Sequence, residues 1–319
     1  MMAIESSIFD PYTGSDWKAV FIKEVGEEYT DRMLFVIDGF SYEPYGSSDE
    51  EGPSGGILPK KSSEILFGEV FDLRGGLCPR KELLESLQHG FDAPLLMVDA
   101  STDLTFFEGI HLDILNASVH IHDNDPGHWL DKLKNLYPDK ELNIRAVDMS
   151  DAGSGHGSLL NFDYDVKEEV IPFIRSLFSK LDHIPDEEVC DIQVSVKFSG
   201  QFVHDVIKVR AIKIAWFNYL QLRHIGSKPF HLEIYLPVHG VYPENVLAHS
   251  NQLVAATMAQ GDTIIFDSRA EATERRILRN AAHIAVIEAG LDRHPDPVAG
   301  SYFIEKVAAD LARRAFIPD

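Results

Sequence analysis

The strongest constraint on the fold is a repeated order in which a short β-rich run precedes a helical pattern. The β-rich runs lie at 65–73, 93–100, 117–123, 142–148, 190–198, 230–236 and 262–268. Most are followed by an amphipathic pattern that ends near glycine, proline or a polar turn. Such repetition is typical of a parallel sheet. Over about 250 residues it favours an α/β fold of the (β/α)8 TIM type over an open doubly wound sheet. The eighth strand is not evident.

The first 64 residues differ from the rest and carry 13 acidic against 5 basic side chains. An amphipathic helix is predicted after Ser15 or Asp16 as N-cap, and the run MLFVIDGF predicts a strand and turn. The helix would turn these side chains inward: Trp17, Val20, Phe21 and Val25. We therefore divide the chain into an N-terminal helical and extended arm for partner docking (1–45), a flexible linker (46–64) and the barrel (65–319).

Composition narrows the function classes. The chain has 319 residues and a formal charge of -22, so its average field repels nucleic acid and anionic membranes. No apolar run is long enough to span a bilayer, and the first residues do not form a signal peptide, which predicts a cytoplasmic protein. With only Cys78 and Cys190, neither a disulfide framework nor a cysteine zinc site is expected.

Several polar residues fall at the ends of predicted strands, where a barrel builds its sites. His120 and His122 share one face of the strand at 117–123, and Asp123 and Asp125 follow it. An H-x-H pair could bind a divalent metal together with three residues from later strands: Asp148, His231 and Asp267. The competing interpretation, which we favour, is a set of hydrogen-bonded polar side chains in the barrel interior.

The stretch AVDMSDAGSGHGSLL places a glycine-rich loop after a strand. Its backbone N–H groups, around Gly153, could cradle phosphate or carboxylate, although glycine loops more often simply turn. His156 is expected to be a surface loop residue. No G-x-S-x-G, H-E-x-x-H or G-x-G-x-x-G motif supports a hydrolase or a dinucleotide-binding fold.

Two helical segments carry basic residues. In the helix at 201–222, an apolar stripe is predicted to face the core, with Lys208 and Arg210 offset from it. The stripe consists of Phe202, Val206, Val209 and Trp216. In the helix at 270–290, a basic row is predicted to face solvent or a partner. That row consists of Arg275, Arg276 and Arg279.

Several segments resemble one known family. DPVAGSYFIEKV (296–307) is similar to the D-P-x-G-G-S-Y-x-[IV]-E-x-L-T segment of methylmalonyl-CoA mutases, and ILRNA (277–281) is similar to the R-x-A-R-N-T-Q stretch upstream of it. IKVRAIKIAW (207–216) resembles the family's A-K-x-R-A-x-R-x-x-W helix, with Lys213 replacing an arginine. FFEGIHLD (106–113) and SDAGSG (150–155) resemble the L-F-x-G-I-P-L-D turn and the E-A-G-A loop. The acidic first 64 residues resemble the N-terminal arm of the family's small (β) chain.

The resemblance implies a (β/α)8 barrel, with acyl-CoA threaded along it during a cobalamin-dependent rearrangement between succinyl-CoA and methylmalonyl-CoA. The sequence departs from the family at functional positions. Asp148 stands where catalytic members carry the His of an S-G-Y-H motif. The family's N-N-I-V-R appears as residues 244–248 and keeps one asparagine, Asn245. The D-x-H-x-x-G motif, whose His is the lower cobalt ligand, does not occur in this sequence.

We therefore expect a non-catalytic mutase-like chain of the small-subunit type, with a large mutase subunit as partner or a homo-oligomeric state, and with acyl-CoA as a candidate ligand. No cofactor is expected on this chain alone, and adenosylcobalamin is expected only in a catalytic partner. The candidate pocket consists of His120, His122, Asp148, Gly153, His231, Asn245 and Asp267. The alternatives are an active mutase barrel served by a separate cobalamin-binding chain, a metal-dependent barrel hydrolase or lyase, and a ligand-binding module without catalysis.

Overall fold

The computed structural model describes residues 13–46, 57, 64–123, 126–138, 141–149, 160–186, 189, 192–237, 244–267 and 272–317. Its main sheet is built from eight parallel strands: β3 (Leu66–Asp72), β4 (Leu95–Val98), β5 (Ala117–Ile121), β6 (Ile144–Asp148), β7 (Leu160–Asp165), β8 (Ile192–Lys197), β9 (His231–Leu236) and β10 (Thr263–Phe266).

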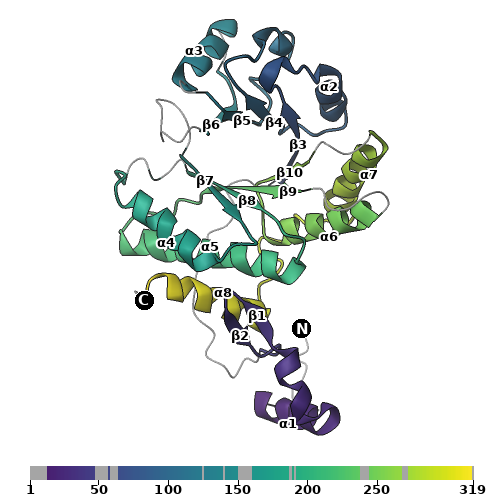
Figure 1. The fold of residues 1–319 in the computed structure, drawn as a ribbon, viewed down its shortest axis with the longest axis vertical. Helices are drawn as coiled ribbons and strands as arrows, with labels where there is room; N and C mark the ends of the chain where they lie inside the picture. The colour runs from purple at the N-terminus through teal and green to yellow at the C-terminus, as the bar shows by residue number, and fades with distance from the viewer. Residues whose placement is uncertain are drawn as a thin grey trace, which may run out of the picture.

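The strands follow the order β6-β5-β4-β3-β10-β9-β8-β7. The two edge strands, β6 and β7, lie in contact, so the sheet curls into a nearly closed barrel (Figure 1). Helices α2 (Arg80–Gln88), α3 (Pro126–Leu136), α4 (Val170–Leu181), α5 (Phe202–Leu222), α6 (Glu244–Met258) and α7 (Ala272–His283) surround it. The (β/α)8 prediction is confirmed.

The strand that the sequence did not reveal is β7. Its outward positions, Phe162 and Tyr164, are buried under α4, whereas its alternate positions are Asn161, Asp163 and Asp165. Asn and Asp are depleted in strands. Because half of β7 consists of these residues, the run LNFDYD did not look like a strand.

Helix α5 is buried around most of its circumference because α8 (Tyr302–Ala315) crosses its outer side (Figure 1). The predicted stripe is buried at Val206, Val209 and Trp216. The basic residues offset from that stripe are buried as well. Lys208 and Arg210 are 5% and 8% exposed. A helix enclosed on both sides must pair its charges internally.

The buried cations of α5 each join a separate element to the barrel. Arg210 binds Asp296 and Glu305 at 3.0 and 3.1 Å. Lys213 donates to the carbonyl oxygens of Ala259 and Gln260, which follow α6, at 2.9 and 3.0 Å. The ammonium of Lys213 therefore satisfies backbone acceptors at the C-terminal end of α6.

The N-terminal helix α1 (Gly14–Val25) begins two to three residues earlier than predicted. Thr13 is its N-cap, and the Asp16 side chain completes a capping box by accepting from the Thr13 N–H. The expectation that Val20 and Val25 point inward was wrong, because they are 48% and 39% exposed. No residue of α1 is buried.

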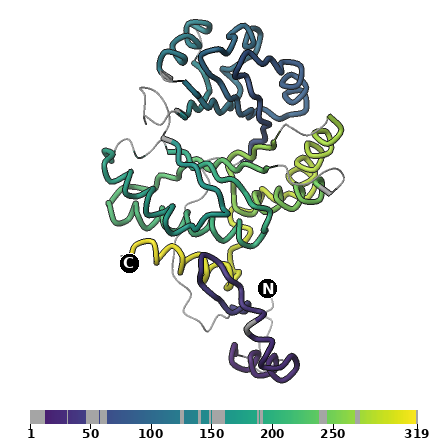
Figure 2. Tube along the Cα trace, in the orientation of Figure 1, coloured from purple at the N-terminus to yellow at the C-terminus, as the bar shows by residue number. Residues whose placement is uncertain are grey.

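The hairpin of β1 (Phe35–Ile37) and β2 (Phe40–Tyr42) packs on the outer helices of the chain's own barrel. Figure 2 shows it beyond α8, with α1 further from the barrel. Asp38, at the hairpin tip, binds Lys208 Nζ at 2.7 Å and accepts from the Val170 N–H at 2.6 Å. Tyr42 donates to Asp310 at 2.8 Å. The tip therefore caps α4, whose own N-cap residue, Glu169, makes no side-chain capping bond.

The predicted basic row of α7 is wrong at Arg279. This residue is fully buried and binds Glu69 of β3 through Nε at 2.8 Å and Glu85 of α2 through Nη1 at 3.0 Å. Position 279 lies beside the buried Leu278 on the barrel-facing side of α7. The guanidinium therefore links α7 and α2 to β3. Helix α7 continues as a π-helical turn at Ile284–Glu288.

Candidate functional site

The barrel interior carries polar side chains, where barrels of this type usually pack branched aliphatic residues. They come from six neighbouring strands, at positions that alternate with the outward apolar ones. The set is Ser118, His120, Arg145, Asn161, Gln193, Ser195, His231, Glu233 and Thr263. Most are joined by hydrogen bonds, and the centre of the set is Glu233.

Among the residues that the structure describes, two hydrogen bonds cross the barrel. Ser118 Oγ donates to Glu233 Oε2 at 2.5 Å, and Arg145 Nη2 lies 3.4 Å from Thr263 Oγ1. Four steps in the strand order separate β5 from β9, and four separate β6 from β10. In a ring of eight strands, four steps is the opposite side. These contacts, which we call the axial bridge, therefore span the barrel axis.

Other side chains complete the environment of Glu233. His120 Nε2 lies 3.7 Å from Oε1, and Ser195 Oγ lies 3.3 Å from the same oxygen. Burial by itself would raise the pKa of Glu233, but His120, Arg145 and Ser118 outweigh burial and lower it to about 2. The carboxylate is therefore ionised at neutral pH.

Some buried polar atoms of the interior have no hydrogen-bond partner among the described residues. These are His120 Nε2, Arg145 Nε and Gln193 Oε1. The bridge residues make further contacts: His231 Nε2 lies 3.0 Å from Thr263 Oγ1, and Arg145 Nη2 lies 3.3 Å from Ser118 Oγ. The arrangement can hold charge and protons inside the barrel, because a carboxylate, a guanidinium and an imidazole lie within one network.

The structure brings together only some of the predicted pocket residues. His120 and His231 belong to the interior network. His122 lies at the barrel mouth, where burial first, and then the charges of Arg74 and His120, lower its pKa. Near it, Arg74 makes a two-bond pair with Asp72, at 2.8 and 2.7 Å.

The other predicted pocket residues lie apart from the network or outside the description. Asp267 accepts from Tyr235 OH at 2.8 Å. Asn245 is buried on α6, and its Oδ1 has no hydrogen-bond partner among the described residues. Asp148 ends β6, but its side chain is not described. Asp125, Gly153 and His156 lie outside the described residues. In the part of the chain that is described, no three His, Cys, Asp or Glu side chains converge as metal ligands would.

The residues that matter most, Glu233, Ser118 and Arg145, were not among the sequence-based candidates. A signal for two of them was present. Glu233 shares a strand face with His231, and Ser118 shares one with His120, because both pairs are two residues apart. Extending the alternation from the histidines would have found both.

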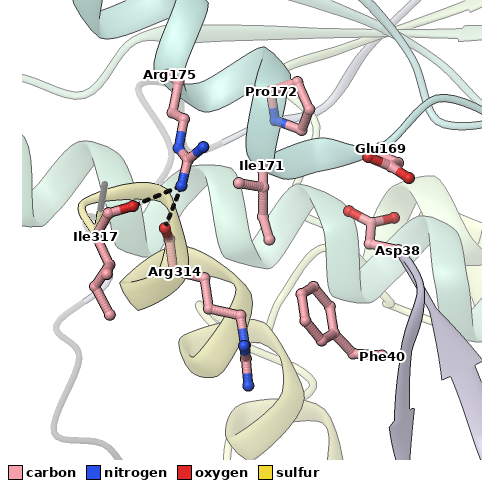
Figure 3. Close-up of a pocket in the computed structure, with 8 residues that line it drawn as sticks. All are labelled: Asp38, Phe40, Glu169, Ile171, Pro172, Arg175, Arg314 and Ile317. Atoms are coloured by element: carbon pink, nitrogen blue, oxygen red, sulfur yellow. Dashed lines mark hydrogen bonds between the residues drawn. The ribbon is translucent and has the colours of Figure 1, made fainter. Parts of the chain in front are cut away.

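A separate cavity lies where the hairpin meets α4 and α8 (Figure 3). This cavity of about 400 Å³ lies between Phe40, Ile171 and Ile317, with Arg175 and Arg314 beside it. Arg175 donates to the carbonyl oxygens of Arg314 and Ile317 at 3.2 and 2.6 Å, and the Arg314 guanidinium stacks on Phe40 at 4.1 Å. Both cations therefore stabilise the junction itself.

Comparisons with known proteins place these observations in context. The family model described as methylmalonyl-CoA mutase matches residues 141–317. A comparison with curated proteins finds no match. Among solved structures, that of Mycobacterium tuberculosis Rv1207 aligns with 79% of this chain and 98% of its own, at 10% identity and a TM-score of 0.33. Such a likeness carries no argument about function. None of the described helices combines the length and apolar character needed to cross a bilayer.

Proposed function

Because the chain belongs to the methylmalonyl-CoA mutase family, we propose that it is a non-catalytic barrel of the small-subunit type, which supports a cobalamin-dependent mutase chain as its heterodimer partner. The partner would interconvert succinyl-CoA and methylmalonyl-CoA. The present chain would supply a folded barrel and a docking arm.

The observation that carries this proposal is the axial bridge. A mutase that threads an acyl-CoA along its barrel needs an open axis. Here Ser118 and Glu233 meet across the axis at 2.5 Å, and the ionised carboxylate is held further by His120 and Arg145. Opening this path would leave buried charges unpaired, at a cost of about 3–5 kcal/mol.

The residue at the end of β6 bears on the cofactor. Asp148 ends β6, on the side of the barrel mouth, and stands where catalytic members of the family carry a histidine. The residues of this barrel therefore do not fit adenosylcobalamin chemistry, and we assign the cofactor to the partner chain. No reaction step is derived for this chain.

The test is co-expression of the tagged chain with a cobalamin-binding mutase chain from the same organism. We expect an equimolar complex that survives gel filtration, with turnover contributed by the partner. A chain that remains alone in the presence of that partner would contradict the proposal.

One observation favours the runner-up, an active barrel served by a separate cobalamin-binding chain. The polar interior leaves His120 Nε2 and Gln193 Oε1 without hydrogen-bond partners among the described residues, as a site that awaits a ligand would. The two functions differ in the reconstituted mixture. If this barrel is catalytic, His120→Ala abolishes turnover, whereas a scaffold tolerates the change as long as the complex forms.

A further inference from the structure

We propose that the cavity between the hairpin, α4 and α8 binds a small zwitterion whose ammonium and carboxylate groups stand at opposite ends of an apolar body. This inference goes beyond the proposed function, because the site lies outside the barrel and needs no partner chain. The cavity, drawn in Figure 3, measures about 400 Å³. This volume lies within the roughly 300–1,000 Å³ that is usual for small-molecule sites.

The middle of the cavity has apolar walls. Ile171 and Pro172 belong to α4, Phe40 belongs to β2, and Ile317 follows α8. Ile171 is 9% exposed and Ile317 is 48% exposed, so the walls extend from the core to the surface. A ligand with an apolar body is favoured here, because covering these side chains removes apolar area from water.

One side of the cavity is cationic. Figure 3 shows Arg175 and Arg314 on the same side of Ile171. Arg314 pairs with Asp310 through Nε at 2.7 Å and stacks on the Phe40 ring. A guanidinium group carries five N–H donors, so Arg314 keeps donors with which it can bind a ligand carboxylate.

The other side of the cavity is anionic. Figure 3 shows Asp38 and Glu169 across Ile171 from the two arginines. Asp38 is engaged within the fold, because it binds Lys208 Nζ and accepts from the Val170 N–H. Glu169 is exposed and makes no side-chain capping bond to α4. Its carboxylate can therefore accept hydrogen bonds from a ligand ammonium group.

The opposite charges on the two sides decide the class of ligand. A polyphosphate such as CoA would be attracted by the arginines but repelled by Asp38 and Glu169. A simple amine would be repelled by the arginines. A zwitterion satisfies both sides when its carboxylate faces Arg314 and its ammonium group faces Glu169. Because apolar side chains separate the two sides, the charges of the ligand must also be separated by an apolar body.

The experiment is isothermal titration calorimetry of the complete chain with three matched probes. The first, 6-aminohexanoate, carries both charges on an apolar chain. Hexanoate lacks the ammonium group, and hexylamine lacks the carboxylate. We expect saturable binding of one 6-aminohexanoate per chain and affinities at least about tenfold weaker for the other two probes, because each of them leaves one charged side of the cavity unpaired.

A single substitution assigns the ammonium position. Glu169→Gln should weaken 6-aminohexanoate about tenfold and change hexanoate by less than about twofold, because only the first probe presents an ammonium group to position 169. Glu168→Gln is the matched control. Glu168 is the exposed neighbour of Glu169 and does not line the cavity, so its replacement should change neither affinity by more than about twofold.

Three results would overturn the proposal. The first is an absence of saturable heat with 6-aminohexanoate at millimolar concentration. The second is hexanoate or hexylamine binding as tightly as 6-aminohexanoate. The third is an affinity for 6-aminohexanoate that is the same in Glu169→Gln as in the unmodified chain. None of these measurements involves a mutase chain, so failure here leaves the proposed function standing.

Discussion

At the scale of single residues, the molecule is distinguished by charges that lie inside it and are compensated there. Glu233 is 2% exposed and remains ionised because His120, Arg145 and Ser118 surround it. Replacing Glu233 with Gln keeps its shape but leaves the half-buried Arg145 with Asp262 as its remaining counter-charge. We expect a loss of about 3 kcal/mol in the free energy of unfolding, measured by urea denaturation. Glu288→Gln, at an exposed position, is the control and should change stability by less than about 0.5 kcal/mol.

The same carboxylate predicts a pH dependence. Its pKa falls from 4.5 in the unfolded chain to about 2 in the folded one, so its contribution to stability is present above pH 4.5 and is lost as pH falls toward 2. The stability gap between the unmodified chain and Glu233→Gln should therefore narrow by about 1 kcal/mol between pH 6 and pH 3.5. Urea titrations at the two pH values measure it. A gap that widens at low pH would contradict the assignment of charge.

At this scale, sequence reasoning identified His120 and His231 as candidate site residues. It did not identify Ser118 and Glu233, which lie on the same strand faces. Alternation along one strand can show that Ser118 shares a face with His120. It cannot show that Ser118 meets Glu233, because their contact depends on β5 and β9 lying opposite each other in the strand order. Partners that come together across a barrel are set by topology, which one strand's pattern does not contain.

At the scale of elements, the hairpin tip and α4 depend on each other. Asp38 supplies the capping carboxylate that α4 lacks, and its second oxygen binds the buried Lys208. Asp38→Ala should cost about 3 kcal/mol and expose the hairpin, because it removes a cap and leaves Lys208 without its carboxylate partner. Limited proteolysis followed by mass spectrometry should show faster cleavage within 34–42.

Asp16→Ala is the matched control for this change. It removes the capping box of α1, an exposed helix, and should cost no more than about 1 kcal/mol. Cleavage of the hairpin should then proceed at the unmodified rate. Equal protection of the hairpin in the Asp38 variant would show that its apolar contacts, such as Phe35 against Phe303, suffice to hold it.

Most elements could be predicted because their apolar periodicity was strong. Strand β7 was missed because its inward residues are polar, and the burial of Arg279 was missed because a row of arginines on a helix is usually solvated. Both errors have one cause. These polar residues lie in the interior of the protein, whereas residue-type statistics predict that such residues lie on the surface.

At the scale of the whole molecule, the observed barrel is the architecture that the resemblance to the mutase family implies. The strand–helix repeat predicted the (β/α)8 architecture, and the match to methylmalonyl-CoA mutases covers residues 141–317. The barrel is extended on one side by α8 and the hairpin, which add further layers outside α5 (Figure 1). Beyond them, α1 lies further from the barrel (Figure 1). The barrel is therefore supported on one side by elements of its own chain.

The central claim is that the axial bridge closes this barrel to a threaded acyl thioester. Isothermal titration calorimetry of the isolated chain with succinyl-CoA and methylmalonyl-CoA tests it most directly. The account predicts no heat of binding above dilution for either thioester. Saturable binding of one thioester per chain, lost when a bulkier side chain replaces Ser118, would show that the axis opens to a ligand and would contradict the account.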